Sequence, residues 1–125
     1  MRDLTIQNLN PHSYPTSDDQ LSNMNTLLVV VNATQKEYGV QFVVTSGLRS
    51  LADQQRINPT APKSAHLEGQ AVDIRDADLK LAAWTKANLD LMEKLGLFME
   101  DFDHTRGWVH YTIREPKSKK RVFIP

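Results

Sequence analysis

The feature that most constrains the fold is a pair of short β-type segments, each carrying a polar side chain able to bind metal. Residues 70–74 are apolar around one carboxylate, Asp73. A carboxylate in such a segment is costly to bury unless it is paired or binds a cation. Residues 108–113 alternate and are rich in aromatic and β-branched side chains, so they also predict a strand. If the two strands are neighbours, Asp73 and His110 lie side by side.

A third potential ligand, His66, precedes the first strand. Gly69 suits a turn that folds this histidine back over the carboxylate. Zinc accepts imidazole nitrogen and carboxylate oxygen, and catalytic zinc keeps one position of its tetrahedral shell open. The chain has no cysteine, so any metal site must use nitrogen and oxygen ligands. We therefore predict a zinc site made by His66, Asp73 and His110, although a lone histidine is more often an ordinary core or surface residue.

The rest of the chain predicts one α+β domain over 1–125. Residues 1–16, with two prolines, indicate an irregular N-terminal arm. Ser17 begins a capping-box sequence, and apolar residues recur at helical spacing up to Gly39. We expect a small antiparallel sheet with helices packed to one side. The further expected elements are strands over 40–45 and 97–102, helices over 51–57 and from Asp76 or Asp78 to Gly96, a loop over 58–63 that walls the cleft, and an edge strand within 121–125.

Three blocks of sequence occur in an order that resembles a known group of enzymes. They are Thr45-Ser-Gly-Leu-Arg-Ser50, Ser64-x-His66-x-x-Gly69-x-Ala71-x-Asp73, and Trp108-Val-His110. Together, over about residues 40–113, they resemble the zinc D-alanyl-D-alanine carboxypeptidases and the related bacteriophage L-alanyl-D-glutamate endolysins. The resemblance implies a hedgehog-type zinc peptidase fold in which His66, Asp73 and His110 bind Zn²⁺.

The resemblance also implies a substrate and several roles. The substrate would be a peptidoglycan stem peptide, cut by carboxypeptidase or endopeptidase action. Arg49 would stabilise the oxyanion or anchor the substrate carboxylate, and Ser64 would contact the substrate or orient the site. His104 has three interpretations: a fourth ligand, a hydrogen-bond donor to the transition state, or an ordinary loop histidine.

The general base is the point at which this chain departs from the pattern. Several members carry an acid three residues before the last histidine, where this chain has Gly107. We expect the base among the upstream acids, with Glu100 first and Asp101 and Asp103 after it. Two alternatives stay open: a zinc-stabilised module that binds the cell wall without turnover, and an α+β domain without metal.

Charge and hydropathy limit the partners. The 15 basic and 15 acidic residues balance, so no positive excess favours nucleic acid. The longest apolar run, 27–31, is too short to span a membrane, and the first residues lack the apolar core of a signal peptide. We expect a soluble protein made in the cytoplasm that reaches the cell wall by another route, such as a phage enzyme released at lysis. No pattern specifies an oligomeric state.

Overall fold

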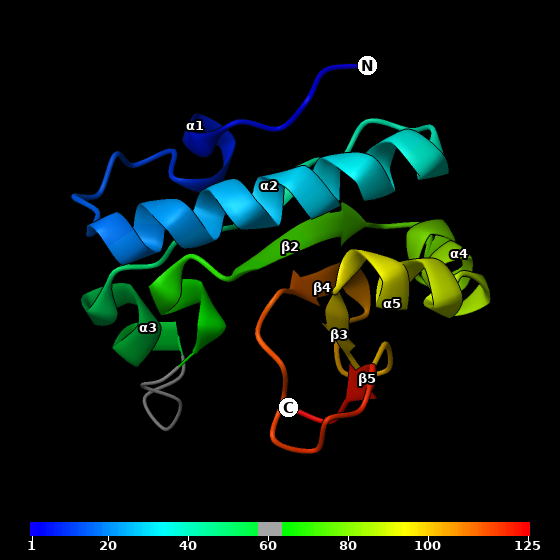
Figure 1. Cartoon of the computed structure of the whole chain (residues 1–125). Coiled ribbons are helices and arrows are strands. Elements are labelled where there is room, and N and C mark those ends of the chain that lie inside the picture. The colour runs from blue at the N-terminus through cyan, green and yellow to red at the C-terminus, as the bar shows by residue number, and fades with distance from the viewer. Residues whose placement is uncertain (58–63) are drawn as a thin grey trace.

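The computed structural model describes residues 1–57 and 64–125 (Figure 1). The loop 58–63, expected to wall the cleft, lies outside the described residues. The helices are α1 (Ile6–Leu9), α2 (Asp18–Tyr38), α3 (Leu51–Ile57), the 3-10 helix η1 (Ala65–Glu68), α4 (Lys80–Ala87) and α5 (Leu89–Leu95). The strands are β1 (Val44–Ser46), β2 (Ala71–Asp76), β3 (Phe98–Glu100), β4 (Gly107–Thr112) and β5 (Val122–Phe123).

The strands form one five-stranded sheet in the order β1-β2-β4-β3-β5. The α+β prediction is confirmed, with one difference: β5 pairs parallel to β3, whereas the other pairs are antiparallel. Figure 1 shows α2 running alongside β2, with α3 at one end of the sheet and α4 and α5 toward the other. Within the described residues, no helix has both the length and the apolar character needed to cross a membrane.

The central pair β2–β4 separates the core from the site. Alternate residues of a strand point to opposite faces. Val72 pairs with Tyr111 and Ile74 with Val109, and all four are buried in the core. Asp73 pairs with His110 between them. These two polar side chains therefore lie on the face opposite the core.

Helix α2 supplies much of that core and begins as predicted. The Ser17 hydroxyl accepts a hydrogen bond from the Gln20 N–H at 3.1 Å, and the Gln20 side chain accepts one from the Ser17 N–H at 2.9 Å. The helix ends at Gly39, whose φ of 83° is left-handed. Its buried apolar residues are Met24, Leu27, Leu28 and Val31.

Three local expectations were wrong. The arm is not irregular throughout, because it contains α1, whose Leu9 is buried. The predicted strand over 40–45 begins only at Val44, because the Phe42 N–H donates to Gln35 Oε1 at 2.7 Å. The predicted second helix is divided at Asn88, whose side-chain amide donates to the Trp84 carbonyl at 2.8 Å.

Candidate active site

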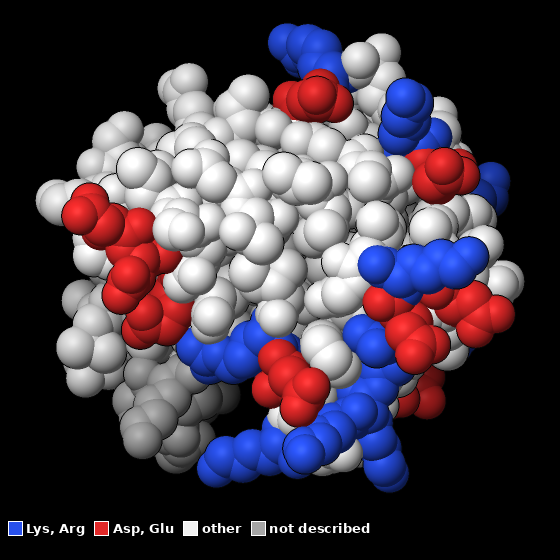
Figure 2. All heavy atoms as spheres, in the orientation of Figure 1, with Lys and Arg blue, Asp and Glu red and all other residues white. Residues whose placement is uncertain are grey.

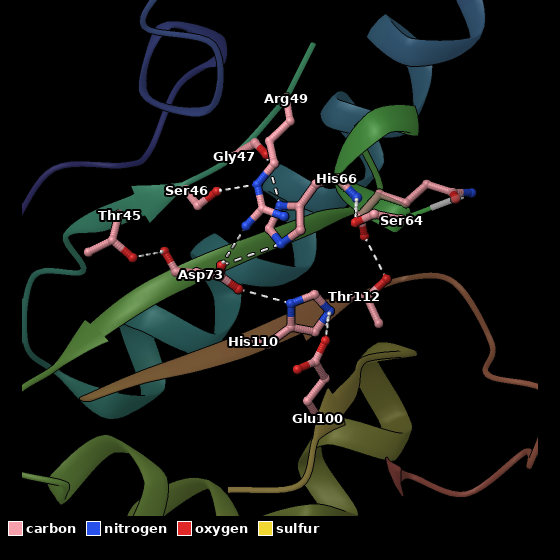
Figure 3. Close-up of polar contacts among 11 residues, drawn as sticks. Thr45, Ser46, Gly47, Arg49, Ser64, His66, Asp73, Glu100, His110 and Thr112 are labelled. Carbon is pink, nitrogen blue, oxygen red and sulfur yellow. Dashed lines mark hydrogen bonds and ion pairs between the residues drawn. The ribbon is translucent and has the colours of Figure 1, made fainter. Parts of the chain in front are cut away.

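Asp73 and His110 form the centre of the site because the register of β2 and β4 pairs them directly. The distance between Asp73 Oδ1 and His110 Nδ1 is 2.9 Å. Both residues are buried, with 7% of Asp73 and 5% of His110 exposed. Figure 3 shows the two side chains pointing toward one another from adjacent strands. This is the juxtaposition that strand alternation predicted.

His66 is brought to the same point by η1. The Ser64 hydroxyl accepts a hydrogen bond from the His66 N–H at 3.2 Å at the start of η1, and Gly69 ends it with a left-handed φ of 72°. A Cβ at Gly69 would lie 2.9 Å from the Gln20 carbonyl oxygen, so only glycine fits this turn. The expected turn between His66 and β2 is thus present, and 3% of His66 is exposed.

The tautomer of His66 follows from its contacts. His66 Nδ1 lies 2.8 Å from the Gly47 carbonyl oxygen, which can only accept, so Nδ1 carries the proton. In the neutral ring the lone pair is therefore on Nε2, which lies 3.4 Å from Asp73 Oδ2, and only the protonated ring can donate a hydrogen bond to Asp73 from that atom. A backbone carbonyl that orients a histidine through its other ring nitrogen is typical of metal sites.

The three side chains fit a zinc ion by geometry and by donor type. Ligand atoms of His66, Asp73 and His110 lie within 4.8 Å of one another. Zinc bonds of roughly 2.0–2.2 Å in a tetrahedral shell place ligand atoms about 3.3–3.6 Å apart. The distance between His66 Nε2 and Asp73 Oδ2, 3.4 Å, falls in this range. Two imidazoles and one carboxylate form a donor set that zinc accepts and that leaves a fourth position.

The Asp73 carboxyl is held in its charged form. Burial by itself raises its pKa, but the hydrogen bonds with His110 and His66, together with the charge of these rings when protonated, outweigh burial and hold the pKa well below its usual range. A carboxylate that stays ionised at neutral pH is what metal binding requires.

Arg49 lies beside the triad rather than in solvent. Its Nη2 is 3.5 Å from Asp73 Oδ2, and its Nε donates to Ser46 Oγ at 3.1 Å. Its backbone N–H donates to the His66 carbonyl at 3.3 Å. The turn after β1 therefore places a guanidinium at the site, as the sequence predicted.

Glu100 approaches from the other side, at the end of β3. Its Oε1 lies 3.6 Å from His110 Nε2, and its side chain is 25% exposed. In contrast, Asp101 Oδ2 pairs with His104 Nδ1 at 2.8 Å in the turn after β3, and half of the His104 side chain is exposed. Asp103 is also exposed. The structure brings Glu100 to the triad, and does not bring Asp101, Asp103 or His104 there.

A cleft of about 370 Å³ opens over these side chains. Ser64, for which a contact with substrate is expected, lines it. Arg114 and Phe123 also line it and were not singled out from the sequence. Arg114 was detectable, because the alternation that aligns Trp108, His110 and Thr112 continues to it. Phe123 comes from β5, and no sequence signal placed that strand beside the site. The described residues of the lining are Arg49, Ile57, Ser64, Ala65, His66, Asp73, Glu100, Trp108, His110, Thr112, Arg114, Pro116, Phe123 and Pro125.

Comparison with known proteins agrees with this architecture. The solved structure of Serratia marcescens L-Ala D-Glu endopeptidase ChiX is similar, with a TM-score of 0.54 and 20% sequence identity, covering 90% of this chain and 99% of that chain. At this identity the similarity establishes a common fold. A comparison with curated proteins gives no match. The profile of the Peptidase M15 family matches residues 3–111, which is most of the chain. The chain therefore belongs to the Peptidase M15 family.

Proposed function

We propose that the protein is a zinc-dependent peptidase that hydrolyses peptidoglycan stem peptides. One observation carries the proposal: three buried ligand atoms, an ionisable carboxylate and a guanidinium meet in one cleft. Membership in the Peptidase M15 family supports peptidase chemistry. The name of the similar structure, an L-Ala D-Glu endopeptidase, supports a substrate of the cell wall.

The metal would be held by His66 Nε2, the Asp73 carboxylate and His110. Zinc bound there would supply a Lewis acid that polarises the scissile carbonyl and makes water nucleophilic at neutral pH. The Gly47 carbonyl would keep His66 in the tautomer needed for binding, since it accepts a hydrogen bond from the Nδ1–H. With the hydrogen on Nδ1, Nε2 of the neutral ring is the nitrogen that can bind the metal.

Glu100 would be the general base. Its carboxylate would accept a proton from the attacking water and deliver it to the amide nitrogen as the C–N bond breaks, giving a new carboxylate and a free amine. The side chain is near His110 yet a quarter exposed, so both water and substrate can reach it. In this proposal Glu100 replaces the acid that several members of the family carry at the position of Gly107.

Arg49 would act on the carbonyl oxygen. Its guanidinium is oriented by Ser46 and held beside Asp73, so its charge is directed at the centre of the site. Donors that are already in place where negative charge develops lower the barrier most effectively. We propose the L-alanyl–D-glutamate bond as the first candidate for cleavage and the terminal D-alanyl–D-alanine bond as the second.

Digestion of purified peptidoglycan tests the proposal. The zinc-loaded protein should release fragments whose masses identify the bond that is cut. Glu100→Gln should retain one zinc per chain and lose most of the cleavage, by about 10²–10⁴-fold. Asp101→Asn is the matched control and should cleave normally, because Asp101 pairs with His104 away from the triad. A zinc-binding parent protein that binds peptidoglycan but never cuts it would instead be the silent module.

A further inference from the structure

We propose that Arg114 forms, with Ser64, a subsite that binds a free carboxylate of the stem peptide next to the bond that is cut. This inference rests on the proposed function and assigns a specificity role to an arginine for which the triad has no use. Arg114 lies two residues beyond the end of β4 at Thr112, and both it and Ser64 line the cleft.

Contacts with Thr112 and Gln70 hold Arg114 in place. Its backbone N–H donates to Thr112 Oγ1 at 3.0 Å, and its Nε donates to Gln70 Oε1 at 2.7 Å. The Thr112 hydroxyl in turn donates to the Gln70 carbonyl at 2.9 Å. This contact with Gln70 orients the guanidinium of Arg114, which lines the cleft. A planar fork that is already oriented loses little entropy when it binds a carboxylate.

Arg49 and Arg114 act at different places. Arg49 contacts the Asp73 carboxylate, so its charge is used at the triad itself. Arg114 lies four residues beyond His110, roughly 13 Å along the chain at about 3.3 Å per residue. The long arginine side chain recovers part of that distance. Since one residue of an extended peptide spans about 3.5 Å, the subsite serves a carboxylate within one or two residues of the cut bond.

The chemistry of both candidate bonds supplies such a carboxylate. A D-glutamate linked through its side chain keeps a free α-carboxylate, and a terminal D-alanine carries the C-terminal one. Ser64 complements Arg114, because its oxygen accepts from the His66 N–H and a hydroxyl also carries a proton that it can donate. A guanidinium and a hydroxyl together match the two oxygens of a carboxylate.

The surroundings of the cleft favour the same ligand. The segment 114–121 contains only one acidic residue, Glu115, and its basic residues are Arg114, Lys117, Lys119, Lys120 and Arg121. Figure 2 shows Lys and Arg side chains gathered along the lower edge of the molecule, over the C-terminal segment. A positive field beside a cleft raises the local concentration of anionic substrates.

Titration calorimetry tests the subsite without requiring turnover. Two synthetic stem peptides are compared, one with the free α-carboxylate on D-glutamate and one with that carboxylate as an amide. Zinc-loaded Glu100→Gln protein should bind the acid about 10- to 100-fold more tightly than the amide, as expected for a charge-assisted contact. Adding Arg114→Gln should remove this preference, Arg114→Lys should restore part of it, and Lys117→Gln, an exposed charge-matched control, should leave it unchanged.

Kinetics of the parent protein separate the two proposals. If the parent releases fragments but treats acid and amide peptides equally, the subsite is wrong and the proposed function stands. If the acid is preferred in titration but nothing is cleaved, the subsite stands and the peptidase proposal fails. Failure to bind either peptide, or a preference that survives in Arg114→Gln, overturns the subsite. Urea unfolding of Arg114→Gln and Arg114→Lys verifies that each variant is folded.

Discussion

Gly47→Ala is expected to weaken zinc binding although Gly47 contributes no side chain to the site. An ideal Cβ at this position would lie 2.2 Å from the Leu9 carbonyl oxygen and 2.9 Å from its carbonyl carbon. Real Cβ atoms do not approach backbone this closely, so α1 and the turn after β1 must move apart. The 2.7 Å hydrogen bond from the Leu48 N–H to the Leu9 carbonyl would be lost with that movement.

The magnitude follows from two costs. Overpacking against backbone costs about 1–3 kcal/mol, and the lost backbone hydrogen bond about 0.5–1.5 kcal/mol, so the free energy of unfolding should fall by about 1.5–4.5 kcal/mol. The Gly47 carbonyl would also leave His66 Nδ1, which it contacts at 2.8 Å. Loss of such an orienting contact lowers metal affinity by about 10–100-fold.

Urea unfolding of the metal-free protein and competition with a zinc chelator measure the two effects separately. Gly39→Ala is the matched control, because a Cβ at Gly39 meets nothing within 4 Å and the cost arises only from its φ of 83°. It should lose about 1–2 kcal/mol of stability and keep its zinc affinity. If Gly47→Ala binds zinc as tightly as the parent does, the orienting role of the Gly47 carbonyl is refuted.

Two further predictions concern residues away from the metal. Tyr14→Phe should raise the pKa of Asp53, measured by NMR titration, because the hydrogen bond from the Tyr14 hydroxyl, at 2.5 Å, is the main cause that lowers it. A lowered pKa contributes stability above the unfolded value near 3.9 that is lost as pH falls through the folded value, so the variant's stability should decline less on acidification. Tyr111→Phe should cost about 1–2 kcal/mol in urea unfolding, because the buried Thr85 hydroxyl loses its partner at 2.7 Å, while zinc affinity stays unchanged. Reduced zinc affinity in Tyr111→Phe would show that the core face and the site face of β4 are not independent.

The triad could be predicted because strand alternation is strict. A polar residue within each of two apolar strands must face away from the core, and one antiparallel register pairs Asp73 with His110. The turn at Gly69 and the capping of α2 could also be predicted, since each depends on a few neighbouring residues. Local sequence patterns were therefore sufficient to predict which side chains meet at the centre of the site.

Other features depended on contacts between distant segments. Helix α1 has four residues and no periodicity, and it is held by burial of Leu9 and by the bond from Leu48. The late start of β1 depends on Gln35 of helix α2, because its side-chain oxygen accepts the hydrogen bond of the Phe42 N–H. The pairing of β5 with β3 joins segments separated by about twenty residues and brings Phe123 into the cleft. Each of these features depends on tertiary contacts, which cannot be predicted from the pattern of neighbouring residues.

The most direct test is metal analysis of the purified protein combined with X-ray absorption at the zinc edge. We predict one zinc per chain, with two imidazole nitrogens and a carboxylate oxygen in its first shell, and loss of that zinc in His66→Ala. A folded parent protein that takes up no zinc at stoichiometric level, or a shell without histidine, would contradict the account.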